Sequence, residues 1–398
     1  MNRKILAVAI TALLAANAAN AAEIYNKDGN KIQLKGKVEA AYKFNGKSDF
    51  RSVEEGKLQN DKITGNHSNK DKTFVRFGFH GETQINSQLT GYGVFEHQFN
   101  PDNREGNTKD DDNTRLAYAG LKYANLGSLD FGRNVGVVQH VRDFTDNAPV
   151  FGGDGFGGGA DQFLTGRASS LATYSVTDAF GYVDGLNMYL QYQAKHEHND
   201  ANKVREDHGN GFAFTTTYEH EQTGLGGAFT YANSDRTEDQ RQEAFGTDGN
   251  HAEIWGIAAK YDANNIYAAI SWAQSNNLID VSKYGSKDGY YANSTDFAHK
   301  TRGLEVLANY TFDFGLTPSI VYNQLRARDL RNFDETGIAK TNAYVVKYIG
   351  VGAEYAFNKN IDMAVGYKFN LIDEDAVYTN YRGIHSDDQV EMRLTYNF

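Results

Sequence analysis

Apolar and polar residues alternate along much of this chain with a period of two. The final nine residues show the pattern most clearly, with the apolar set Val390, Met392, Leu394, Tyr396 and Phe398 separated by Glu391, Arg393, Thr395 and Asn397. Successive side chains of a β-strand project to opposite faces, so this segment predicts a strand with one apolar and one polar face. The same alternation recurs in residues 186–192, 304–312 and 361–371. It favours a large β-sheet with an oily side and a wet side.

The connections between these segments fall into two kinds. Short turns are predicted at Asn86–Thr90, Ala124–Ser128, Thr177–Gly185, Glu221–Gly226, Asp262–Asn265, Asp313–Thr317 and Phe357–Asn360. Longer polar loops are predicted at residues 45–72, 100–113, 134–163, 195–209, 233–250, 275–300, 326–343 and 373–388. Seven turns and eight loops join sixteen strands, with both termini on the short-turn side. This pattern predicts an all-β fold, a 16-stranded antiparallel transmembrane β-barrel.

A soluble β-sandwich is the alternative fold, because its strands also alternate with period two. It does not account for Tyr and Phe along the apolar face of nearly every strand, or for long loops on one side only. Sixteen strands enclose a space too wide for side chains to fill, whereas eight do not. The barrel interpretation therefore predicts a water-filled channel.

The first residues read as an export signal. Arg3 and Lys4 precede an apolar run at residues 5–16, and small residues follow up to Ala21. The run is too short for a membrane-spanning helix, and the pattern predicts a signal peptide at 1–21, with an N-terminal anchor as the alternative. Residues 22–398 are then expected to form a single barrel domain. We expect no disulfide framework, since the 398 residues include no cysteine.

Charge narrows the range of partners. The formal net charge is -11, and removing Arg3 and Lys4 makes it -13. Such acidity argues against a nucleic-acid partner, which normally requires a basic patch. A mean hydropathy of -0.61 is too polar for a helical membrane protein.

The third long loop, residues 134–163, differs from the others in being apolar and rich in glycine. Its residues Val135, Val137, Val138, Val141, Phe144, Val150, Phe151 and Phe156 are poorly suited to lie in external water. Folded into the barrel, they could pack on the wall while polar neighbours face the pore. The alternative, a phosphate-cradling loop, lacks the GK[ST] ending and a following helix pattern.

Long stretches of the chain resemble one known family. The segments AEIYNKDGNK, GETQINSQLTGYG, TRLAYAGLKYANLGSLDFGRNVGVV, FGGD, KYDANNIYAA and FDFGLTPSI, with the terminal Phe398, are similar to enterobacterial general diffusion porins of the OmpC/OmpF type. The resemblance runs from Ala22 to Phe398. It implies a homotrimer of barrels in a Gram-negative outer membrane, contacting lipid and lipopolysaccharide, with the third loop folded into each lumen.

The resemblance also assigns a pore constriction. Its basic wall residues match Lys37, Arg76, Arg115 and Arg167. The periodicity independently places Lys37, Arg76 and Arg115 on polar faces, and a cation on the lipid face near the midplane would cost about 2–4 kcal/mol. The alternative is a Lys or Arg that reaches the membrane interface.

The acidic side of the constriction departs from the family pattern. The first acidic position matches Asp146, but the second, directly after Pro149, is Val150. His140 and Arg142 add possible positive charge, while Asp154 and Asp161 are possible substitutes for the missing carboxylate. We expect a pore that is less cation-selective than a typical family member.

Further residues are assigned by the resemblance alone. Glu105 matches the family's loop-two latch and Arg133 its acceptor on a neighbouring barrel, although a solvated loop charge is the simpler interpretation of Glu105. Phe398 matches the terminal signal read by the outer-membrane assembly machinery.

Other chemistry is weakly indicated. His196 and His198 have a spacing that could hold a metal, and Asp110, Asp111 and Asp112 could bind a divalent cation, but solvated loops explain both. No nucleophile motif such as G-x-S-x-G appears, so we expect neither an enzyme nor a cofactor. The sequence predicts passive diffusion of small hydrophilic solutes and ions. The alternatives are an anion- or sugar-specific channel, which would need a denser lysine array or an aromatic slide, and a surface receptor or adhesin.

Overall fold

The computed structural model describes residues 22–45, 48–54, 57–65, 70–101, 112–197, 201–242, 247–285, 296–334, 337–373 and 384–398. The predicted signal peptide at 1–21 lies outside them. Among the described residues, eighteen strands form one antiparallel sheet, and β3 with β4 forms a separate pair. Setting aside the short β1 and β5 leaves the sixteen long strands that the alternation predicted. No helix in the described part of the chain is long and apolar enough to cross a membrane.

The strand bounds are β1 Ala22–Lys27, β2 Asn30–Asn45, β3 Ser48–Glu54, β4 Lys57–Gly65, β5 Lys70–Asp71, β6 Phe74–Gln84, β7 Leu89–Phe99, β8 Asn113–Tyr123, β9 Gly127–Val135, β10 Arg167–Val176, β11 Leu186–Gln193, β12 Gly211–His220, β13 Leu225–Asp235, β14 His251–Ala263, β15 Ile266–Asn276, β16 Lys300–Tyr310, β17 Leu316–Asp334, β18 Gly337–Ala356, β19 Ile361–Asn370 and β20 Gln389–Asn397. The helical segments are η1 Ala124–Leu126, α3 Gln139–Arg142, α4 Asp178–Gly181, η2 Ala201–Glu206, η3 Asp239–Arg241 and η5 Val281–Tyr284.

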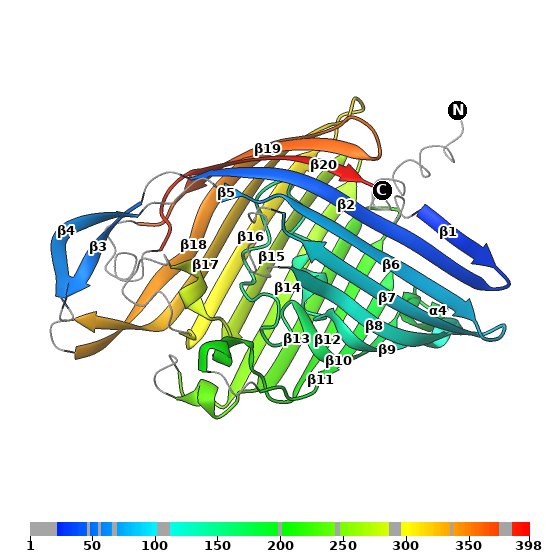
Figure 1. Ribbon diagram of the computed structural model, residues 1–398, viewed down its shortest axis with the longest axis horizontal. Helices are drawn as coiled ribbons and strands as arrows, with labels where there is room; N and C mark the ends of the chain where they lie inside the picture. The colour runs from blue at the N-terminus through cyan, green and yellow to red at the C-terminus, as the bar shows by residue number, and fades with distance from the viewer. Residues whose placement is uncertain are drawn as a thin grey trace.

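The first and last strands close the sheet into a barrel (Figure 1). One edge of β2 pairs with β6, and the other pairs with β20 over Lys37↔Asn397 to Asn45↔Gln389. Phe398 and Gly36 exchange backbone hydrogen bonds of 2.9 and 3.0 Å. Beyond that point β1 covers the rest of the same edge, with Ala22 opposite Leu34. Among the described residues β2 is thus paired along both edges, which matters because lipid can satisfy no backbone group.

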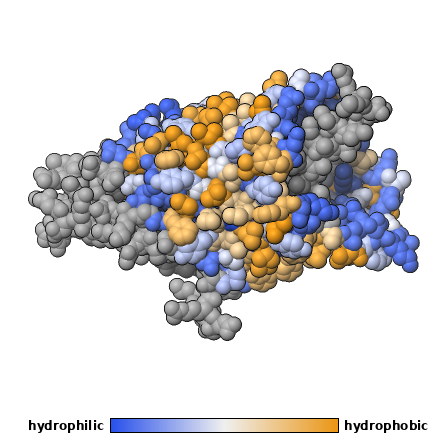
Figure 2. Space-filling model, turned by 90° about the horizontal axis from the view of Figure 1, so that it is seen from above, coloured by the Kyte–Doolittle hydropathy of each residue, from blue (hydrophilic) through white to orange (hydrophobic). Residues whose placement is uncertain are grey.

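The outer face of the barrel is apolar, as the alternation predicted. Figure 2 shows an apolar band across the middle of the surface with hydrophilic residues towards both ends. On β20, Leu394 is 45% exposed and Tyr396 51%, whereas the intervening Thr395 is buried. On β19, Val365 and Phe369 are exposed and Ala364 is buried. The exposed set faces outward, where lipid rather than water is its natural solvent.

The short turns lie where the sequence placed them. Between β6 and β7 the side chain of Asn86 accepts hydrogen bonds from the backbone N–H groups of Gln88 and Leu89, both at 2.9 Å. Asn358 caps the turn between β18 and β19 in the same way. Such Asn turns reverse the chain in very few residues.

Two predicted loops are wrong in part. Residues 326–343 are not a loop, because β17 and β18 continue pairing as far as Asp334↔Gly337. Residues 45–72 contain the β3–β4 hairpin and β5. Backbone pairing therefore continues into both segments for which the polar sequence had suggested loops.

Candidate functional site

The connection between β9 and β10, residues 136–166 and here called loop three, packs on the inward-facing side of the wall. Val137, Val138 and Val141 are at most 1% exposed. Backbone groups of Val137 bond to Gln191 of β11 at 3.0 Å and to Thr215 of β12 at 2.8 Å. The apolar residues that made this loop unusual in the sequence are therefore covered by the barrel.

Hydrogen bonds attach the middle of loop three to strands β15 and β18 of the barrel wall. The hydroxyl of Tyr267 on β15 donates to the Phe144 carbonyl at 2.6 Å, and Thr145 and Ser271 share a hydroxyl contact of 2.8 Å. Farther along, Tyr348 of β18 donates to a carboxylate oxygen of Asp154 at 2.9 Å. Loop three is thus attached to the wall on both sides of its turn at Pro149.

Close backbone packing explains part of the glycine content. A Cβ on Gly303 of β16 would lie 1.5 Å from the Gly155 carbonyl oxygen, so residue 303 must be a glycine. A Cβ on Gly366 of β19 would lie 2.9 Å from the Cβ of Val150. Gly153 adopts φ +74°, a conformation that L side chains rarely take.

The basic wall residues gather around two carboxylates. Arg115 Nε lies 2.6 Å from a Glu96 oxygen, and Arg76 Nε lies 3.9 Å from the same atom. Arg76 also donates to Gln98 at 2.8 Å. Lys37 Nζ pairs with Glu39 at 2.7 Å. The strand register brings these groups together, since Lys37 stands opposite Arg76.

Arg167 joins this cluster from the beginning of β10. The charges that act on it include Arg115, Arg76 and Glu96. All four basic residues taken from the resemblance therefore share one region of the inner wall. With Glu39 and Glu96 included, four cations face two anions there, and the net charge is +2.

The loop-three residues carry less negative charge than their count suggests. Asp146 pairs with Arg142 at 3.1 Å, so each partly cancels the other. Val150 packs against Gly366 and adds no charge. Asp161 pairs with Arg133 through contacts of 2.5 and 2.8 Å, which ties it to β9. The other possible substitute for the missing carboxylate, Asp154, lines a lumen cavity.

His140 adds no positive charge at neutral pH. Its ring stacks on Tyr189 with centroids 4.0 Å apart. Burial lowers the pKa of His140 to about 4, from an ordinary value of 6.5. The sequence interpretation of His140 as a possible cation is therefore wrong at pH 7.

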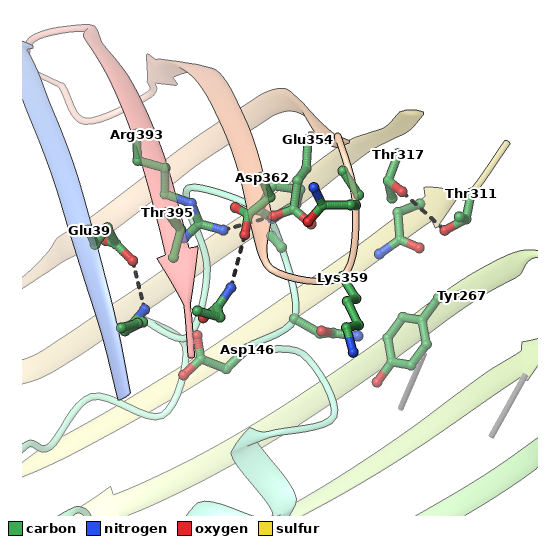
Figure 3. Close-up of a pocket in the computed structure, with 18 of the residues that line it drawn as sticks. Glu39, Asp146, Tyr267, Thr311, Thr317, Glu354, Lys359, Asp362, Arg393 and Thr395 are labelled. Atoms are coloured by element: carbon green, nitrogen blue, oxygen red, sulfur yellow. Dashed lines mark hydrogen bonds and ion pairs between the residues drawn. The ribbon is translucent and has the colours of Figure 1, made fainter. Parts of the chain in front are cut away.

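Loop three separates two cavities in the lumen. The larger, of about 630 Å³, is lined by Lys37, Arg76, Asp146 and residues of the short turns such as Asn358 (Figure 3). The smaller, of about 340 Å³, is lined by Val150, Asp154 and residues of the long-loop end. The segment from Asp146 to Asp154 thus contributes lining residues to both cavities.

The remaining predicted residues have mixed outcomes. Arg133 donates to the Thr114 carbonyl at 2.8 Å in addition to binding Asp161. Glu105, His198, Asp110 and Asp111 lie outside the described residues. The Phe398 ring covers Gly36, where a Cβ would come within 2.5 Å of it. Among the described residues no group of three His, Cys, Asp or Glu is arranged to hold a metal.

Sequence reasoning assigned no role to Glu96 or Glu305. Glu96 and Gln98 share the inner face of β7. The contact between Glu96 and Arg115, however, depends on the register between β7 and β8. Glu305 is fully buried and accepts hydrogen bonds from the Gly153 and Gly155 backbones at 2.6 and 3.4 Å. A carboxylate on the polar face of an apolar strand was the available signal.

A closed antiparallel barrel with an apolar outer band and charged cavities inside defines the class of outer-membrane β-barrel channels. The family model of the Gram-negative porins matches residues 27–398. The chain therefore belongs to the Gram-negative porin family.

Two named relatives align with this chain along its whole length. Outer membrane porin F of Salmonella typhi is 43% identical over 399 residues, with all of both chains covered. Outer membrane porin protein OmpD of Salmonella typhimurium is 44% identical over 400 residues, also with full coverage. The solved Salmonella typhi OmpF complex with daunomycin has a TM-score of 0.77 and 39% identity, over 95% of this chain and 100% of that one. The chain is an outer-membrane general diffusion porin, which forms a water-filled channel for small hydrophilic solutes and ions.

Proposed function

We propose that loop three forms the constriction of this channel and that the narrow part sorts solutes by size and charge. The observation that carries this proposal is the position of Asp146–Asp154, attached to the wall between two cavities. A second supporting observation is that Lys37 and Arg76, which belong to the basic cluster with Arg115 and Arg167, line the same cavity as Asp146. Opposed charges in a narrow pore set a transverse field that orders water and permeating ions.

We propose further that this channel prefers cations less strongly than family members that have a carboxylate at the position of Val150. The supporting contacts are the Arg142–Asp146 pair and the packing of Val150 on Gly366. At about 8 Å and an effective ε near 20, one unit charge is worth roughly 2 kcal/mol. The interaction energy lost with one carboxylate is therefore large enough to change the ion selectivity of the channel.

The reversal potential in a salt gradient tests this proposal. We expect a value near zero or a small cation preference for the purified protein in a planar bilayer. A strong cation preference would contradict the proposed role of Val150. Absence of current would contradict the channel itself, so the two failures are distinguishable.

As a further proposal, we infer from family membership how the protein is exported and assembled. The chain is exported with residues 1–21 removed, Phe398 is the signal for the outer-membrane assembly machinery, and three barrels associate amid lipid and lipopolysaccharide. Glu105 would reach Arg133 of a neighbouring barrel. Because Arg133 already binds Asp161 in its own chain, we expect Glu105 to join that pair rather than replace it. In this proposal the protein transports solutes and catalyses no reaction.

A further inference from the structure

Five lysines from five separate segments line the smaller cavity at the long-loop end. Lys43 lies on β2, Lys72 follows β5, Lys283 is in η5, Lys347 is on β18 and Lys368 is on β19. Lys72 and Lys368 are the like charges that act most strongly on Lys43. The alternation places Lys43 and Lys368 on the inner face, since their neighbours Tyr42 and Tyr367 are exposed outside.

The negative charges in this cavity do not balance the lysines. Glu391 pairs with Lys72 at 3.2 Å, and Asp154 accepts a hydrogen bond from Tyr348. Five lysines and two carboxylates leave a net charge of +3 among the lining residues. Val150 lines the same cavity and contributes hydrocarbon where a carboxylate would have neutralised one more lysine.

Aromatic rings and a carbonyl position two of the ammonium groups. Lys368 Nζ lies 5.0 Å from the Tyr348 ring centroid and 6.0 Å from that of Phe151. Lys283 lies 4.9 Å from the Tyr284 ring centroid and donates to the Gly158 carbonyl. A cation above an aromatic face retains its charge and keeps most of its attraction for an anion in the cavity.

The cavity on the other side of loop three has the opposite balance. Its acidic lining residues are Glu39, Glu96, Asp146, Asp262, Glu354 and Asp362, and its basic ones are Lys35, Lys37, Arg76, Lys359 and Arg393. Six carboxylates against five cations give -1. Figure 3 shows Arg393 directed at Glu354, which it contacts at 3.0 Å. The two ends of the lumen therefore differ in sign.

We propose that Lys43, Lys72, Lys283 and Lys368 form a binding site for small multivalent oxyanions, such as phosphate esters, at the long-loop mouth of the channel. The proposal rests on the proposed function, because the site lies along the permeation path. An anion with two or more charges can contact several ammonium groups at once, whereas chloride cannot. The site holds such solutes at the mouth before they reach the constriction.

Block of single-channel current by inorganic pyrophosphate tests the site. Pyrophosphate is added to one side of a bilayer in KCl without divalent cations. Orientation is read from a Ser87→Cys variant, biotinylated and bound by streptavidin from the short-turn side, because the chain has no other cysteine. We expect half-block from the long-loop side at a concentration about tenfold lower than from the other side, given the opposite charges of the two cavities.

Matched variants separate this site from general electrostatics. The Lys43→Gln/Lys368→Gln double variant should weaken the long-loop-side block about tenfold. The Lys35→Gln/Lys359→Gln double variant removes the same charge from the other cavity and should leave that block within about twofold, because neither lysine lines the smaller cavity and salt screens charges that lie farther away. Equal block from both sides of the wild-type channel, or equal loss in both variants, would overturn the proposal. If Lys43→Gln/Lys368→Gln does not assemble, the sidedness of the wild-type block decides the outcome alone. If the wild-type protein conducts no KCl current even before pyrophosphate is added, that result would instead contradict the proposed function.

Discussion

The carboxylate of Glu305 accepts a hydrogen bond from the backbone N–H of Gly153 at 2.6 Å, which joins strand β16 to loop three across the lumen. The other carboxylate oxygen lies 3.4 Å from the Gly155 nitrogen. Because Glu305 is fully buried, the two N–H groups have no water to replace it. This one side chain therefore holds two residues of the proposed constriction.

Replacing Glu305 by Gln should loosen loop three. The amide retains one acceptor oxygen but turns the other position into a donor that faces a backbone N–H, at a cost of about 1–3 kcal/mol. We expect noisier single-channel current and faster entry of larger sugars into liposomes. Glu253→Gln is the control, since Glu253 bonds to Asn233 and Tyr231 and not to loop three. Equal sugar exclusion in both variants would contradict the role of Glu305.

The Gly303–Gly155 contact predicts a strong steric effect. In Gly303→Ala the new Cβ would lie 1.5 Å from a backbone oxygen, so loop three must move. Overpacking typically costs about 1–3 kcal/mol. We expect a lower temperature for loss of the β-sheet circular dichroism signal. Gly81→Ala, whose Cβ would meet nothing within 4 Å, should melt as the wild type does; matching melting curves for both variants would argue against the contact.

Val150→Glu should raise the preference for cations. The new carboxylate would enter the cavity that contains Lys368 and Lys43 and would offset part of their charge. One unit charge at about 8 Å is worth roughly 2 kcal/mol at an effective ε near 20. Val150→Gln has the same length without the charge and should leave the reversal potential unchanged. A reversal potential that moves equally in both variants would show that shape, not charge, is responsible.

His140 predicts how the channel responds to acid. Because burial lowers the pKa of His140 to about 4, the ring stays neutral between pH 7 and pH 5. His140→Gln and the wild type should then show the same change in reversal potential over this range. A divergence centred near pH 6.5 would mean that His140 titrates normally.

The same pKa shift affects stability in a defined direction. An imidazole whose pKa is lower in the folded state binds fewer protons there than in the unfolded chain. Its contribution is complete above about pH 6.5 and is lost as the pH falls from 6.5 towards 4. The wild type should lose more thermal stability than His140→Gln across that interval, and an equal loss would count against burial of the ring.

Period-two alternation was sufficient to predict the sixteen strands and their lipid-facing sides. It failed at residues 326–343, where the polar sequence suggested a loop but the backbones of β17 and β18 remain paired. The sequence also marked loop three through its buried valines such as Val137. Pattern alone describes one strand at a time, and this limits what it can say about a site.

Contacts between residues on different strands could not be predicted from the sequence. The Glu96–Arg115 pair requires the register of β7 against β8, and the lysine site unites residues as distant as Lys43 and Lys368. The pairing of Arg142 with Asp146 and the stacking of His140 on Tyr189 also changed the charge that loop three carries. These effects arise from barrel closure and side-chain packing.

The rate at which liposomes containing the purified protein swell in isotonic sugar solutions tests the central claim most directly. A water-filled channel narrowed by loop three predicts fast swelling with a pentose, progressively slower swelling as the sugar grows, and rates that rise linearly with concentration. Liposomes that stay impermeable to the pentose, or rates that saturate with one sugar only, would contradict the account.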